Sequence, residues 1–445
     1  MAKRGLPTVC ILTEAFESLG RVTASGAGMP SLPIVFIPHP VNSLPEKEML
    51  KIADEAFPKV IRCLIEAGQK PAPEEEMPLE KKRIFSSEFT LEDGSLEGIN
   101  RRFYESGWTD GLPIIPPSRA AVERMLTFTD REPLEVIATL PPRGGKATVE
   151  KIAANAVMAG CVPEYLPVII ATVQALAEEK DMNLCGIVST TNPTTVAVMV
   201  NGPMAAELDI NAGLGCFGSG WRANAAIGRA VRLIILNIGG GAPGTVDKAT
   251  QGQPGKYSFC FAENEEENPW TPFHVERGFP REVSTVTVFS PHGLVPISEF
   301  ASQTGRGVLT TIANTMAYPG GINILRCSPD PASQEAGQPA VILPPEFAEM
   351  AAKDGFSKDA LKSFLYERAQ VPFTAIGGEW ETSRRFRGEG VPILKVAPRP
   401  EEILIAVAGG PGRQCAFFPN FTRPVTRPIA RKDGTSVKSV YEFKK

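Results

Sequence analysis

The sequence contains few of the residues from which metal sites and catalytic triads are usually built. Only three of its 445 residues are histidine, and no two of its eight cysteines are separated by two residues. This spacing excludes a zinc ribbon and a Cys-x-x-Cys redox pair. No apolar run approaches the roughly 20 residues of a membrane-spanning helix, and the first residues do not resemble a signal peptide. We therefore expect a cytoplasmic protein without a membrane partner, whose thiols are reduced.

The sequence also lacks a basic excess. The formal net charge is −4, which argues against nucleic acid as a partner. The content of 43% hydrophobic and 22% charged residues is typical of a globular protein, and the length allows two or three domains. Glycine and proline, 41 residues each, recur between periodic segments and indicate ordered turns.

The first part of the chain predicts half of a small α/β unit. Residues 7–12 form an apolar run, residues 15–28 follow with helical character, and residues 32–40 form a second apolar run. This order predicts strand, helix, strand. Two strands and one crossover do not bury a parallel sheet, so either the rest of the chain or another polypeptide completes it.

The same segment carries a resemblance. The stretch "RGLPTVCILTEAF…GAGMPSLPIVFIPHPVNSLPEKEM" resembles the C-terminal part of the UGSC-type (seleno)protein domain over about residues 4–66, most specifically at Ile37-Pro38-His39-Pro40. It is more distantly similar to the B-type selenoprotein subunits of glycine, sarcosine, betaine and proline reductases. The resemblance implies a Cys-Gly-Ser-Cys or selenocysteine motif just upstream of the matched part. No such motif occurs in this sequence, so the family's redox residues are not carried over.

The remaining chain predicts a larger mixed α/β domain. We assign residues 1–67 to the half-unit, including a helix over 45–67, residues 68–92 to a linker rich in proline and charge, and residues 93–445 to the large domain. That domain has a possible break near 245–285. Cys185–Val188, Ile322–Arg326 and Ala340–Leu343 are among its predicted strands. No internal repeat is evident in the sequence.

The densest candidate site is a glycine-rich loop that leads into a helix. Apolar residues recur at helical spacing from Ala223 to Ile235, and Ser219 or Gly220 is the expected cap. Free amides at a helix N-terminus favour an anion, and they could also stabilise the thiolate of Cys216. The predicted substrate-binding residues are Gly215, Gly218, Ser219, Gly220, Trp221, Arg222 and Asn224. The alternative is that the glycines only permit close packing and that Cys216 is a core residue.

Three further residues, like Cys216, are candidate catalytic residues. If the backbone at residues 274–276 is extended, His274 and Glu276 point to the same side, and the carboxylate could orient the imidazole. The alternative is a salt-bridged surface strand. The neighbouring run of glutamates could hold a hard cation, but we assign no metal site. His39 follows a strand at the end where α/β sheets place ligands. We expect Cys10 and Cys185 to be inert inside strands.

Three functions remain open at this stage. The first is the large subunit of a thiol- or selenol-dependent oxidoreductase or C–X bond-cleaving complex. It would act on a small anionic substrate, with the nucleophile supplied by a second subunit that carries a Cys-Gly-Ser-Cys-type motif. The second is a non-catalytic scaffold that completes a partner's fold, and the third is a stand-alone hydrolase or lyase. The sequence identifies no cofactor.

Overall fold

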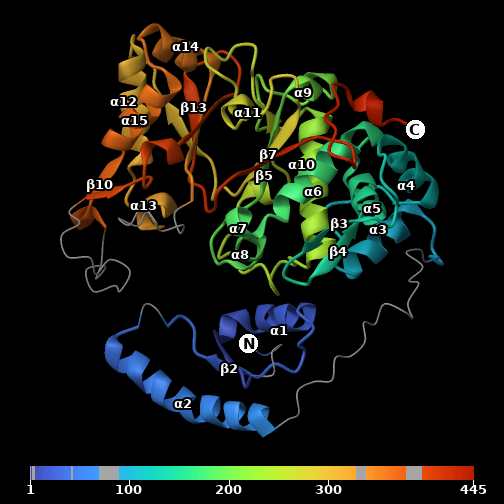
Figure 1. Cartoon of the computed structure of the whole chain (residues 1–445). Helices are drawn as coiled ribbons and strands as arrows, with labels where there is room; N and C mark the ends of the chain where they lie inside the picture. The colour runs from blue at the N-terminus through green and yellow to red at the C-terminus, as the bar shows by residue number, and fades with distance from the viewer. Residues whose placement is uncertain (1, 3–5, 42–43, 70–89, 327–336, 377–392) are drawn as a thin grey trace.

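A computed structural model describes residues 2, 6–41, 44–69, 90–326, 337–376 and 393–445 of the chain. Figure 1 shows a small N-terminal unit, in blue, next to a larger α/β body. Most of the predicted linker, residues 70–89, lies outside the described residues.

The N-terminal unit has the predicted strand–helix–strand order. Strands β1 (Cys10–Thr13) and β2 (Ile34–Ile37) pair in parallel, with Cys10 opposite Ile34. Helix α1 (Glu17–Gly26) connects them, and α2 (Glu46–Gln69) follows β2 and packs against it. Within the described residues this sheet has only these two strands.

One end of this unit touches the body. Leu19 of α1 packs against the largest hydrophobic cluster of the body. The backbone of Gly26 lies so close to the segment 142–144 that a Cβ at this position would lie 2.5 Å from the carbonyl oxygen of Arg143. Only glycine permits this approach, because any other residue would clash with backbone atoms.

The body contains two four-stranded mixed sheets. The first has the order β14-β7-β5-β6 and the second the order β12-β9-β13-β8. Their strands are β5 (Ala197–Asn201), β6 (Cys260–Ala262), β7 (Thr285–Phe289), β8 (Val295–Ser298), β9 (Ala340–Leu343), β12 (Leu404–Val407), β13 (Gln414–Phe418) and β14 (Val425–Pro428). Two shorter antiparallel pairs complete the strands, β3 (Val136–Leu140) with β4 (Gly145–Thr148) and β10 (Gln370–Pro372) with β11 (Ile393–Lys395).

The two large sheets repeat one topology and exchange their last strands. In the first, β5 pairs in parallel with β6 and antiparallel with β7; in the second, β9 pairs in parallel with β12 and antiparallel with β13. The strand that follows β7 along the chain is β8, but it pairs with β13. The strand that follows β13 is β14, and it pairs with β7. The topology is therefore duplicated although the sequence shows no repeat.

The two exchanging connections cross each other. Pro291 and Asn420 form an isolated antiparallel bridge. Around it, the amide of His292 donates to Pro419 O (2.8 Å), and the amide of Phe421 donates to Ser290 O (2.9 Å). These paired bonds join the two halves of the body at the amino ends of β5 and β9.

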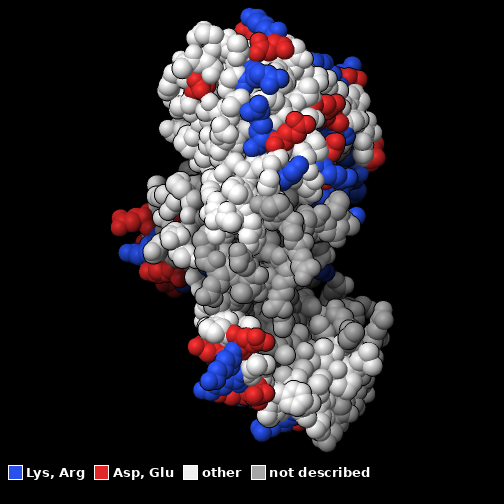
Figure 2. Space-filling view, turned by 90° about the vertical axis from the view of Figure 1, so that its left-hand side faces the viewer, with Lys and Arg blue, Asp and Glu red and all other residues white. Residues whose placement is uncertain are grey.

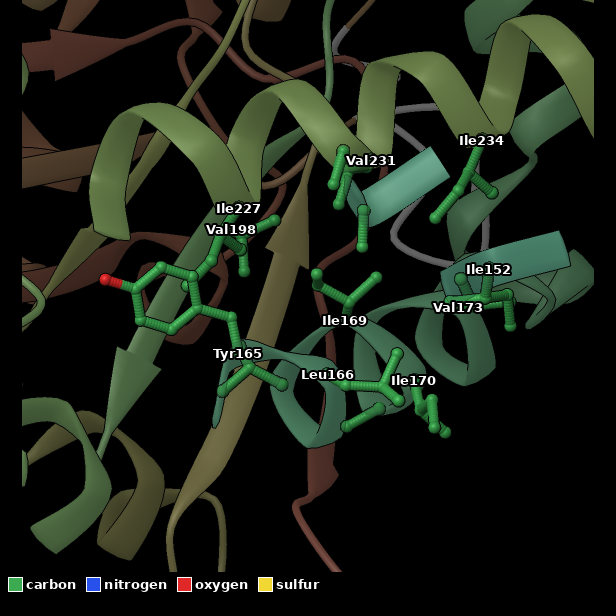
Figure 3. Close-up of a cluster of buried hydrophobic side chains, with 14 of the residues drawn as sticks. Ile152, Tyr165, Leu166, Ile169, Ile170, Val173, Val198, Ile227, Val231 and Ile234 are labelled. Carbon is green, nitrogen blue, oxygen red and sulfur yellow. The ribbon is translucent and has the colours of Figure 1, made fainter. Parts of the chain in front are cut away.

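Alternating side chains divide the body into four layers. Met199 and Phe261 belong to a cluster between the two sheets, whereas Val198 and Val200 face the helices that cover the first sheet. Figure 3 shows this outer cluster, where Ile227, Val231 and Ile234 of one helix meet Ile169 and Val173 of another. The second sheet packs its outer face on α12, α14 and α15 in the same way. This arrangement establishes the predicted α/β class, with a parallel half-unit followed by a mixed α/β domain.

The helices of the body follow the predicted apolar periodicity where that pattern is long. Seven apolar positions between Ala223 and Ile235 are all buried, as the stripe predicts. The helices are α3 (Leu96–Glu105), α4 (Arg119–Met125), α5 (Val149–Ala159), α6 (Leu166–Leu176), α7 (Glu179–Met182), α8 (Leu184–Ser189), α9 (Pro203–Glu207), α10 (Arg222–Ile234), α11 (Phe273–Glu276), α12 (Gly305–Met316), α13 (Ile322–Arg326), α14 (Pro345–Lys353) and α15 (Lys358–Arg368).

Two predicted strands are helices. Cys185–Val188 lies in α8, where Asn183 caps the helix by accepting a hydrogen bond from the amide of Gly186 (3.1 Å). Ile322–Arg326 forms α13. Both segments are short apolar runs, for which periodicity alone does not separate a strand from a buried helix.

On the face shown in Figure 2, basic and acidic side chains are interspersed. In the part of the chain that the structure describes, no helix is both long enough and apolar enough to cross a membrane.

Candidate functional site

The carboxyl ends of β5, β6 and β12 meet at one end of the body. The loop after β5 reaches both neighbours, because Ala262 N donates to Asn211 O (3.2 Å) and Gly409 N donates to Ala212 O (2.8 Å). Asn264 N donates to Val407 O (2.7 Å) and joins the two sheets directly. In α/β proteins this edge of a sheet is where ligands bind, and it contains the predicted glycine-rich loop.

The glycine-rich loop is held by Asn224 of α10. The Asn224 Oδ1 accepts from Asn211 N (2.8 Å), and its Nδ2 donates to Asn211 O (3.1 Å) and to Cys216 O (3.2 Å). Asn224 is 4% exposed. Its amide is therefore fully used inside the protein, where it fixes the loop.

The other predicted binding residues of this loop are more accessible. Gly215, Gly218, Ser219 and Gly220 are exposed. The predicted cap is wrong, because Trp221 occupies the N-cap position of α10 and no side chain accepts a bond there. The guanidinium of Arg222 donates through Nε (3.1 Å) and Nη2 (2.9 Å) to Gly160 O, the residue that ends α5. Arg222 thus ties α10 to α5.

Cys216 does not have the environment that the sequence suggested. It is 3% exposed and lies in the cluster between the two sheets. The next residue, Phe217, has ring contacts with Phe259, Phe261 and Phe418. Burial raises the pKa of the Cys216 thiol to about 12. The predicted lowering of its pKa is wrong, because the loop folds inward at this residue and removes the sulfur from water.

The pairing of His274 with Glu276 is also wrong. Residues 273–276 form the short helix α11 instead of an extended strand. Glu276 forms ion pairs with Lys358 (2.9 Å) and with Lys362, both on α15. Burial alone would raise the pKa of Glu276, but these two ammonium groups lower it. Glu276 therefore joins α11 to α15.

The carboxylate nearest to His274 is Glu265. Its Oε1 lies 3.6 Å from Nδ1 of His274, and the Nε2 of His274 lies 3.4 Å from Arg281 O. His274 has no exposed surface, and burial lowers its pKa while Glu265 acts in the opposite direction. A solvent-borne substrate therefore does not contact this imidazole in the present structure.

A buried carboxylate network at this edge was not predicted from the sequence. Oε2 of Glu263 accepts from Asn201 Nδ2 (2.6 Å) and from Phe273 N (2.7 Å), and Oε1 accepts from Asn268 Nδ2 (3.0 Å). Burial raises the pKa of Glu263, and Lys358 and the donors oppose this effect. The same Asn201 amide donates to Glu265 (3.1 Å). The sequence does contain a signal for this network, because Asn201 ends the apolar strand β5 and Glu263 directly follows the apolar strand β6.

The remaining predicted residue, His39, lies in the N-terminal unit. It is exposed beyond the carboxyl end of β2, where its Nδ1 lies 3.0 Å from Thr13 Oγ1 at the end of β1. The ring of Phe16 packs against the imidazole edge to face at 5.6 Å. The structure thus places His39 at the carboxyl edge of the parallel pair, in a different unit from the other candidates. Within the described ranges, no three His, Cys, Asp or Glu side chains are grouped so that they could hold a metal ion.

Comparison with known proteins identifies the first unit only. Residues 1–66 match the model of the UGSC family, in agreement with the resemblance of residues 4–66. No curated protein matches the chain, and neither does any solved structure. The N-terminal unit is therefore similar to the UGSC family. The more distant resemblance to the reductase subunits stays a prediction.

Proposed function

We propose that this chain is the large subunit of an enzyme complex in which a partner chain completes the UGSC-type unit and supplies a nucleophilic cysteine or selenocysteine. The complex would carry out a redox or C–X bond-cleaving reaction on a small anionic substrate. The observation that carries the proposal is the incomplete burial of the N-terminal unit. A two-stranded parallel sheet is unusual, since such sheets normally have more strands and are covered on both faces.

The exposed surface of α2 supports the proposal of a partner chain. One face of this helix packs on β2 and buries Ala56. A second apolar stripe remains exposed, and its spacing of seven, four and four residues keeps it on one side of the helix. It consists of Leu50 (59% exposed), Phe57 (65%), Ile61 (40%) and Ile65 (56%). A contiguous apolar stripe of this kind indicates an interaction surface.

The burial of several cysteines in this chain favours a nucleophile that is supplied by the partner chain. Burial raises the pKa of Cys161, Cys216, Cys260 and Cys415. A thiol must be ionised to attack, so these four are poor nucleophiles in this fold. Cys10, Cys63 and Cys185 are half-buried, and Cys327 lies outside the described residues.

The test is reconstitution with a chain that carries the Cys-Gly-Ser-Cys motif of the UGSC family. Size-exclusion chromatography with light scattering should give a hetero-oligomer of the two full chains. Phe57→Asp on α2 should weaken its formation. Leu134→Asp, at a leucine of the body that is even more exposed (75%), should not. The proposal fails if no complex forms, or if both variants assemble as well as the wild type.

The same complex distinguishes catalysis from scaffolding. If the partner supplies the nucleophile, Cys→Ser in its motif abolishes turnover, whereas Cys216→Ala in this chain retains it. Assembly without any thiol-dependent turnover would favour the scaffold function. Turnover by this chain alone would favour a hydrolase or lyase.

A further inference from the structure

A small cavity lies at the opposite end of the first sheet from the glycine-rich loop. It is enclosed by α10, α8, the segment that enters β5, and the loop that follows Gly244, and it has room for one water-sized group (about 20 Å³). Its walls are formed by both polar and apolar groups. The charged side chains that line it are those of Arg232, Asp247 and Lys256.

The charges in this cavity are not balanced. Arg232, Lys256 and Asp247 have side chains that are 15%, 17% and 7% exposed, so water screens them little. Two cations face one carboxylate, which leaves one positive charge. The other ion pair of α10, Arg229 with Asp110, is already neutral.

The hydrogen bonds show which of the two cations is not hydrogen-bonded to Asp247. Asp247 Oδ2 accepts from Lys256 Nζ (2.6 Å), and its Oδ1 accepts from Ala249 N (3.1 Å). Arg232 Nη2 lies 3.9 Å from Oδ2 of Asp247, beyond hydrogen-bond distance. Within the described residues, the guanidinium of Arg232 makes no hydrogen bond. A guanidinium has five N–H donors, so those of Arg232 are available to an anion.

We infer that the cavity is a binding site for the carboxylate of a small organic acid. A monoanion neutralises the excess charge, and a planar carboxylate matches the fork of the Arg232 guanidinium in a bidentate pair. The enclosed room of about 20 Å³ admits one carboxylate oxygen and excludes a tetrahedral phosphate, so the second oxygen and the remainder of the ligand lie at the mouth. Lys256, with one donor committed to Asp247, has others for the same anion.

This inference deepens the proposed function, because it gives the chemical class of the anionic substrate. Only the statement that the bound acid is the substrate rests on the proposed function. Binding itself requires no partner. The two ideas can therefore fail separately: loss of complex formation leaves carboxylate binding by this chain untouched, and absence of binding leaves assembly untouched.

The experiment is calorimetric titration of the full chain with sodium acetate, and with chloride and inorganic phosphate as competing arms. Acetate should bind saturably and more tightly than either. Arg232→Gln should weaken it about tenfold or more, since a charge-assisted pair is lost. Arg427→Gln, the same substitution at a surface ion pair with Glu178, should leave it unchanged.

A measurement on the wild type covers the case in which Arg232→Gln fails to fold. Butanedione modifies accessible arginines, and acetate should slow modification of the peptide that contains Arg232 without slowing that of Arg427. Equal rates with and without acetate would overturn the inference. So would acetate affinity that is unchanged in Arg232→Gln, because the cavity would then hold only water. Tighter binding of phosphate than of acetate would overturn the assignment to a carboxylate.

Discussion

Arg229 of α10 holds Asp110 in a bidentate pair, with Nε donating to Oδ2 (2.8 Å) and Nη2 donating to Oδ1 (2.9 Å). The same Nη2 donates to Pro113 O (2.8 Å). The pair therefore fixes the turn-rich segment around Asp110 onto a helix more than a hundred residues away. Asp110 is 3% exposed and Arg229 is 16% exposed.

Asp110→Asn should destabilise the protein. Removing one partner from a mostly buried pair leaves the other charge uncompensated, at a cost of roughly 3 kcal/mol. Urea unfolding should show this loss as a lower midpoint. The matched control is Asp93→Asn, whose partner Arg101 is 62% exposed and where little change is expected. Equal effects of the two substitutions would contradict a special role for Asp110.

The contribution of Glu276 to stability should depend on pH. Lys358 and Lys362 hold its folded-state pKa below the ordinary carboxyl value, so Glu276 stabilises the fold above that value (about 4.3). This contribution is lost as the pH falls through the folded-state pKa. Glu276→Gln should therefore be less stable than the wild type at pH 7, and the difference should shrink towards pH 3.

The matched control for this pH series is Glu349→Gln, at a surface pair with Lys353 in which the glutamate is 60% exposed. It should be close to the wild type throughout. Denaturant unfolding at pH 7, 5, 4 and 3 measures both series. A difference for Glu276→Gln that is the same at every pH would contradict ionisation as its cause.

Alkylation should separate the cysteines by burial. Near neutral pH, iodoacetamide should label Cys10 and Cys63 faster than Cys161, Cys216 and Cys260, because burial raises the pKa of these three and shields their sulfur atoms. Peptide mass spectrometry gives the rates, and labelling in denaturant should make them similar. Fast labelling of Cys216 in the native protein would restore it as a nucleophile candidate.

Asn224→Ala should loosen the glycine-rich loop. The substitution removes three hydrogen bonds to Asn211 and Cys216 and leaves their backbone groups unpaired, at a cost of about 1–3 kcal/mol in stability. Hydrogen exchange should rise over residues 211–218 and not at β9, in the other sheet. Unchanged exchange in the loop would mean that Phe217 alone anchors it.

Sequence patterns predicted the elements whose structure depends mainly on residues that are close together in the chain. The apolar stripe from Ala223 to Ile235 requires burial on one side of a helix, and α10 has that burial. Ala340–Leu343 is a strand, as its apolar run predicts. The strand predictions for Cys185–Val188 and Ile322–Arg326 were wrong, because a run of four or five residues with apolar character fits a strand or a buried helix equally well.

The candidate site was harder to predict because its partners are distant in sequence. The neighbours of Cys216 along the chain indicated an activated thiol, but Phe418, two hundred residues later, helps to enclose that loop. Glu276 forms ion pairs with Lys358 and Lys362, and no sequence pattern near Glu276 predicts these partners. The Arg232 cavity also combines α10 with a loop that follows it. The sequence does not distinguish Arg229 from Arg232, because their partners Asp110 and Asp247 lie on other segments.

The exchange of β8 and β14 makes each half of the body dependent on the other for an edge strand. If the backbone were cut between β8 and α12, each fragment would carry a strand that belongs in its partner's sheet and would lack one of its own. The crossing at Pro291 and Asn420 would remain as a contact between the two fragments. The body is thus organised like a domain-swapped dimer within one chain. Its two sheets are expected to melt in a single transition, and the two fragments to fold only when they are mixed.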